Sequence, residues 1–126
     1  MITPVYLFAL ILVLSFLILK IMRLRMREQV GLGDARNPEL MRAIRAHGNF
    51  IEMVPFALII MVLLELQSAP PLALHLYGAG WVVARIAHAQ GLYQSAGRSW
   101  GRTIGAVTSL FLLVVGAAAA AAMAVF

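Results

Sequence analysis

Four long apolar stretches constrain the fold of this chain more than any other feature of its sequence. They cover about residues 4–21, 48–66, 71–89 and 103–126. A helix needs roughly 20 apolar residues to cross the hydrocarbon core of a bilayer, and backbone polar groups inside that core have to be hydrogen-bonded within the protein. We therefore expect an all-α integral membrane protein in which residues 1–126 form a single domain, a four-helix bundle.

The composition supports a membrane protein and excludes several other classes. Hydrophobic residues make up 63% of the chain and charged residues 12%, whereas soluble domains have about 25% charged residues. The first apolar stretch is too long for a signal peptide and lacks a basic segment before it, so we expect it to be retained. Without cysteine the chain has no thiol nucleophile of its own, and without a paired motif such as HExxH we expect no metal site.

The positive charges are confined to two connections and the residues beside them. The net charge is +5, and the positive-inside rule then places both basic connections in the cytoplasm and both termini on the opposite side. We therefore expect the polar site to face the cytoplasm, in the inner membrane if the protein is bacterial, and expect no nucleic-acid partner. A second interpretation stays open, in which arginines such as Arg23 only anchor helix ends among anionic headgroups.

A polar stripe enters the second apolar stretch in the segment RAIRAHGNFIEMVP, residues 42–55. Asn37 is placed to cap the helix that follows, with Pro38 at its first position. On that helix Arg45, Asn49 and Glu52 lie within about 60° of each other, with Arg42 beside them. The stripe therefore predicts a polar surface that descends from the cytoplasm into the membrane.

Glu52 lies about 10 Å deeper than Arg45 at the helical rise, where an ionisable side chain needs a partner. Arg85 in the third stretch lies at a similar depth, and His88 follows one turn later on the same face. We therefore expect an ion pair between Glu52 and Arg85. Such a pair could belong to a functional site or could only lock two helices together, and both interpretations remain open.

Two segments resemble a known family. RAIRAHGNFIEMVPF is similar to the second-helix signature of the MAPEG superfamily, the membrane-associated proteins in eicosanoid and glutathione metabolism, in its arginine, asparagine, glutamate and proline. ARIAHAQGLY is similar to the third-helix stretch of that family. The resemblance implies a homotrimer of four-helix protomers that binds glutathione between neighbouring subunits at the cytoplasmic side.

The resemblance also implies roles for particular residues. The glutathione-binding candidates are Arg23, Arg42, Arg45, Asn49, Glu52, Arg85 and His88. An arginine near the start of the fourth helix is expected to stabilise the thiolate, because a nearby cation lowers the pKa of a thiol from about 8.5. The catalytic candidates are Arg102 first, Arg98 second, and Tyr93 from the third helix. Headgroup anchoring remains the alternative for Arg98 and Arg102.

The expected function is a membrane-bound glutathione-dependent transferase or peroxidase that acts on hydrophobic electrophiles or lipid hydroperoxides. Leu92 stands where the eicosanoid synthases carry a tyrosine, which favours a general detoxifying enzyme over a lipid-mediator synthase. A noncatalytic membrane scaffold with the same fold is the alternative. A small multidrug exporter is disfavoured, because it would need an acidic residue in the first membrane helix.

Overall fold

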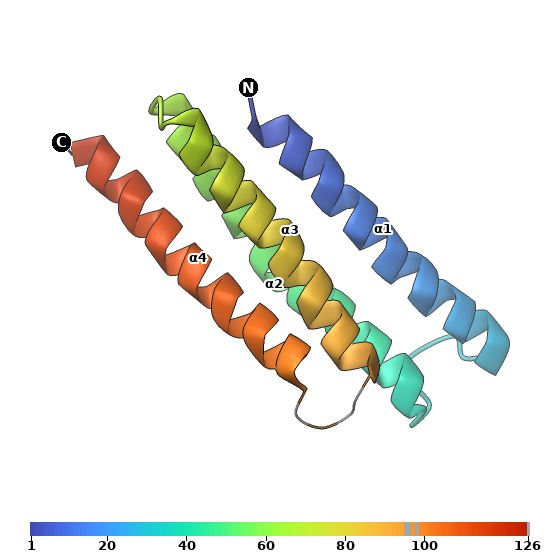
Figure 1. The fold of residues 1–126 in the computed structure, drawn as a ribbon. Helices are drawn as coiled ribbons and strands as arrows, with labels where there is room; N and C mark the ends of the chain where they lie inside the picture. Colours follow the sequence, from blue (N-terminus) through green and yellow to red (C-terminus); the bar gives the residue numbers. More distant parts are fainter. Residues whose placement is uncertain (95–96, 98, 126) are drawn as a thin grey trace.

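The protein consists of four long α-helices packed side by side. The computed structural model describes residues 1–94, 97 and 99–125. Within them the helices are α1 (Thr3–Glu28), α2 (Pro38–Leu66), α3 (Pro71–Gln94) and α4 (Trp100–Val125). In Figure 1, α1 and α4 flank the pair formed by α2 and α3, and the two ends of the chain lie at the same end of the bundle. The predicted all-α membrane bundle is confirmed, and the described part of each apolar stretch falls within one helix.

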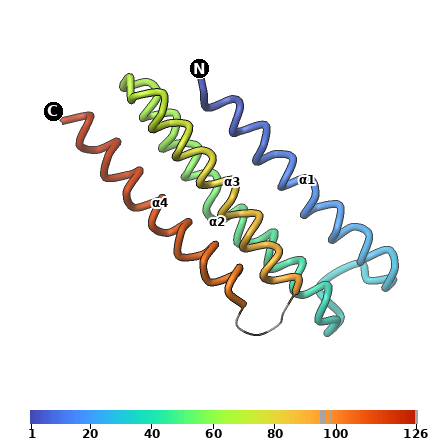
Figure 2. Tube along the Cα trace, viewed as in Figure 1, coloured from blue at the N-terminus to red at the C-terminus, as the bar shows by residue number. Residues whose placement is uncertain are grey.

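The tube in Figure 2 follows the same path and shows α2 and α3 side by side, joined by a tight turn.

The start of α2 is the one expected from the sequence. The side chain of Asn37 accepts hydrogen bonds from the backbone N–H groups of Glu39, at 2.9 Å, and Leu40, at 3.0 Å, and Pro38 occupies the first turn. These contacts satisfy two of the N–H groups that the beginning of a helix leaves free.

Three of the described helices, α1, α2 and α4, are long and apolar enough to cross a membrane. Helix α3, which contains the stretch expected as the third span, is not among them, and it carries His75, Arg85 and His88. It is also the described helix with the most buried residues. Because α3 packs against the other three helices, the side chains of Arg85 and His88 are buried inside the bundle.

Regular spacing explains how the helices pack. The buried residues of α1 recur every seventh position, at Thr3, Leu10, Leu17 and Leu24, which is the period of a single packing seam. The buried residues of α4 are all small, namely Gly105, Ser109, Gly116 and Ala120. Small residues allow two membrane helices to approach closely, so α4 lies directly against α3.

Glu65 of α2 closes the end of the bundle that carries the termini. Helix α1 has no side-chain cap of its own. The Glu65 carboxylate accepts hydrogen bonds from the backbone N–H groups of Ile2 and, at 3.0 Å, Thr3, and lies 3.9 Å from the amino group of Met1. A carboxylate at a helix N-terminus is favourable, so Glu65 joins the start of α1 to the end of α2.

Candidate functional site

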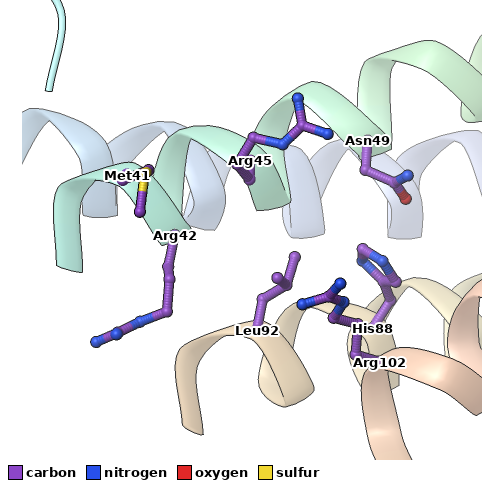
Figure 3. A pocket seen from close by; sticks show the side chains of 7 residues that line it. All are labelled: Met41, Arg42, Arg45, Asn49, His88, Leu92 and Arg102. Atoms are coloured by element: carbon purple, nitrogen blue, oxygen red, sulfur yellow. The ribbon is translucent and has the colours of Figure 1, made fainter. Parts of the chain in front are cut away.

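A cavity of about 400 Å³ lies between α2, α3 and α4, at the end of the bundle opposite the termini. Its lining residues are Met41, Arg42, Arg45, Asn49, His88, Leu92 and Arg102. Figure 3 shows the amide of Asn49 directed toward the ring of His88, with the guanidinium of Arg102 beside Leu92. The cavity therefore unites residues of three helices that are far apart in the sequence.

The charged groups of the cavity are all cationic. Arg42, Arg45 and Arg102 line it, and no carboxylate belongs to the lining. None of the ion pairs among the described residues includes these three arginines. The Nε atom of Arg42 is buried without a hydrogen-bond partner. Because arginine carries its charge at every physiological pH, the cavity is suited to a ligand with carboxylate groups.

Arg85 lies behind the cavity lining and positions one of the lining residues, Asn49. It is only 2% exposed. Its guanidinium donates hydrogen bonds to Oδ1 of Asn49 at 2.6 Å, to the carbonyl oxygen of Gly105 at 3.0 Å and to the hydroxyl of Ser109. Ser109 in turn donates to Gly105 at 2.6 Å. Neutral acceptors on α2 and α4 thus hold a buried cation of α3, and the bond to Asn49 fixes which way its amide points.

The expected ion pair between Glu52 and Arg85 is wrong for this chain. Glu52 is exposed and takes part in none of the ion pairs among the described residues. Three positions beyond Asn49 the helix has turned by about 300° and risen by about 4.5 Å. Asn49 therefore occupies the interface with α3, and Glu52 is rotated onto the outer surface of the protomer.

Arg102 is positioned by a close contact between the end of α3 and the start of α4. The hydroxyl of Ser99 donates to the carbonyl oxygen of Gly91 at 2.9 Å and accepts the backbone N–H of Arg102 at 3.3 Å. A Cβ atom at Gly91 would meet the backbone of Arg102. Neither Ser99 nor Ser109 is predicted from the sequence as part of the site. A serine just before a helix is a recognisable N-cap, whereas a single hydroxyl within α4 gives no such pattern.

Two other candidates, Tyr93 and Arg23, do not line this cavity. Tyr93 follows Leu92 by one position on a regular helix and faces α1, where the ammonium group of Lys20 lies 3.7 Å from the centre of its ring. Arg23 lies on α1 beside a different hollow. Arg98 falls outside the described residues. The structure therefore brings together Arg42, Arg45, Asn49, His88 and Arg102, with Arg85 below them.

The fold and this cavity define an integral membrane helical bundle with a cationic pocket at one end. Comparison with known proteins agrees: the model of the MAPEG family matches residues 3–122, so the chain belongs to the MAPEG family. It is also similar to the inner membrane protein YecN of Escherichia coli K12, with 34% identity over 95 residues that cover 75% of this chain and 72% of YecN. YecN of Escherichia coli O6:H1 matches to the same extent.

Proposed function

We propose that this protein is a membrane-bound glutathione-dependent transferase or peroxidase acting on hydrophobic electrophiles or lipid hydroperoxides. One observation carries the proposal: a cavity lined by three arginines and an asparagine, with no carboxylate in the lining. Membership of the MAPEG family, which includes glutathione transferases, supports the same conclusion.

The chemistry of glutathione matches that lining. The tripeptide carries two carboxylates, and arginine binds carboxylates with two parallel hydrogen bonds. Asn49 already accepts a hydrogen bond from Arg85 through Oδ1, so its amide N–H₂ remains to donate to a ligand acceptor. A volume of about 400 Å³ falls in the usual range for small-molecule sites.

The proposed reaction depends on the thiol of glutathione. The guanidinium of Arg102 would stabilise the thiolate, which is the attacking species. In the transferase reaction the thiolate sulfur forms a bond to an electrophilic carbon and displaces a leaving group such as chloride. In the peroxidase reaction two glutathione molecules are oxidised to their disulfide while the hydroperoxide is reduced to an alcohol and water. His88 is 6% exposed and lines the same cavity as Arg102.

Glu52 supports the proposal that the protein assembles as a homotrimer. In the single chain this carboxylate is exposed, although its position along α2 is farther from the arginine-rich end of the bundle than that of Asn49. Ionisable groups at membrane depth face the interior of an assembly and pair there. A neighbouring subunit would supply that partner. In this arrangement the arginine-rich end faces the cytoplasm of the inner membrane.

The first experiment is glutathione binding to the detergent-purified protein by titration calorimetry. We expect saturable binding that Arg45→Leu weakens by about tenfold or more, because a charge-assisted hydrogen bond contributes about 1.5–3 kcal/mol. Arg36→Leu is the matched control: Arg36 is an exposed arginine of the connection between α1 and α2, away from the cavity lining. Its variant should bind as the natural protein does.

Two results would contradict the proposal. Folded protein that binds no glutathione would favour a noncatalytic scaffold, and equal losses in both variants would mean that net charge alone attracts the ligand. If glutathione binds as expected, activity toward a chloronitrobenzene electrophile identifies a transferase, and activity toward a lipid hydroperoxide identifies a peroxidase.

A further inference from the structure

A second hollow lies on the other side of α3, between α1 and α3, and it differs in kind from the cationic cavity. Its volume is about 400 Å³ and its lining is almost entirely apolar, with Leu12, Phe16, Ile86 and Tyr93 among the lining residues. Leu12 and Phe16 are more than half exposed, so the hollow opens to the surroundings of the bundle. In a membrane, an exposed apolar face of this kind meets acyl chains or another protein surface.

Two positively charged side chains lie at one end of this apolar groove. Phe16 also lines an adjoining hollow formed with Lys20 and Arg23, so the two hollows meet at that ring. The ammonium of Lys20 is held 3.7 Å from the centre of the Tyr93 ring. Arg23 is exposed and takes part in none of the ion pairs among the described residues. The groove therefore ends at two positive charges, neither of which forms an ion pair among the described residues.

The length of this combined surface matches one leaflet of a bilayer. Leu12, Phe16, Lys20 and Arg23 follow each other at spacings of three or four along α1 and so share one face. From Leu12 to Arg23 the helix rises by about 16 Å, and half of a hydrocarbon core is about 15 Å. An apolar groove of that length with cations at its interfacial end is complementary to an acyl chain bearing an anionic headgroup.

We propose that the groove between α1 and α3 binds one anionic phospholipid, with an acyl chain along Leu12, Phe16 and Ile86 and the phosphate at Lys20 and Arg23. This site is separate from the cationic cavity, because Leu92 faces the cavity and Tyr93 faces the groove. The proposal therefore holds whether or not the protein binds glutathione.

The absence of cysteine makes a labelling test direct. A bimane fluorophore on Leu12→Cys would report lipids in the groove. The same label on Ile11→Cys, at nearly the same depth but outside the groove lining, would report ordinary surrounding lipid. Both proteins are reconstituted in phosphatidylcholine vesicles and titrated with brominated phosphatidylglycerol or brominated phosphatidylcholine, which quench the fluorophore on contact.

We expect phosphatidylglycerol to quench the label at position 12 at a mole fraction at least about fivefold lower than phosphatidylcholine, and the label at position 11 with little preference. Lys20→Gln/Arg23→Gln should abolish the preference, and Lys20→Arg/Arg23→Lys, which keeps both charges, should retain it. Arg25→Gln/Arg36→Gln removes two charges from the same end and should also leave it intact.

Three outcomes would overturn the proposal. Equal quenching by the two lipids would mean that the groove has no headgroup preference. Loss of the preference in Arg25→Gln/Arg36→Gln would assign it to diffuse charge. Protection of the label at position 12 from both lipids would show that another protein surface, such as a second copy of the chain, covers the groove.

Discussion

Arg85 is a buried cation whose hydrogen bonds go to neutral acceptors on two other helices. Breaking such an arrangement by removing one partner costs more than the bond itself contributes, because the remaining group stays buried and unsatisfied. Asn49 thus has two roles at the residue scale: its oxygen stabilises Arg85, and its amide borders the cavity.

Replacing Asn49 by Ala should therefore lower the free energy of unfolding by about 1–3 kcal/mol, in addition to weakening glutathione binding. The double variant Asn49→Ala/Arg85→Met should recover part of that loss, because it removes the unsatisfied charge as well. Thermal unfolding of the single and double variants in detergent measures the coupling. Strictly additive effects would mean that Asn49 and Arg85 act independently.

The same residues show how far the sequence could predict the site. Arg42, Arg45 and Asn49 were identified because their spacing on one helix placed them together, and the structure confirms that they line one cavity. The predicted pair of Glu52 with Arg85 is wrong because the rotation of about 60° between Asn49 and Glu52 is enough to turn Glu52 onto the outer surface. Ser109 was missed because nothing in a linear pattern relates a hydroxyl of α4 to an arginine 24 positions earlier.

At the scale of elements, the contact between α3 and α4 determines where Arg102 lies. Their separation is set by glycines, since a Cβ atom at Gly105 would come within 2.7 Å of the carbonyl oxygen of Ala84 and of His88. The apolar length of the two stretches predicts both helices. The sequence does not predict which face of α4 contacts α3, because several positions of α4 are small and any of them could lie at the contact.

Gly105→Ala should consequently destabilise the protein by about 1–3 kcal/mol, as overpacking does, and should reduce activity by displacing Arg102. Gly48→Ala is the matched control within α2, because a Cβ atom there would meet nothing within 4 Å. That control should be neutral or stabilising by up to about 1 kcal/mol, since alanine is the better helix former. Equal destabilisation of the two variants in a thermal unfolding assay would contradict close packing at Gly105.

At the scale of the whole molecule, the four helices place both chain ends and the turn between α2 and α3 at one end of the bundle, and the cationic cavity at the other. The sequence predicts both termini on one side and both basic connections on the other, and the four helices are arranged in that way. The side of the membrane is a separate prediction that rests on the basic connections.

Single cysteines at Leu32 and Ser68 test that orientation. Both residues are exposed, and they lie in the connections at opposite ends of the bundle. In intact bacterial cells an impermeant maleimide should label Ser68→Cys, and Leu32→Cys should react only after the membrane is opened. Labelling of both positions from the same side would contradict the four-helix topology, and the reverse pattern would contradict the cytoplasmic placement of the arginines.

The claim that the cationic cavity activates glutathione is tested most directly by the ionisation of the bound thiol. The ultraviolet absorbance of the thiolate, followed against pH at saturating protein, should give a pKa clearly below the free value of about 8.5. Arg102→Leu should return this pKa toward 8.5 while glutathione still binds, and Arg102→Lys should keep part of the shift because it keeps the charge. An unshifted pKa in the natural protein, or a shift that Arg102→Leu leaves unchanged, would contradict the assignment of Arg102.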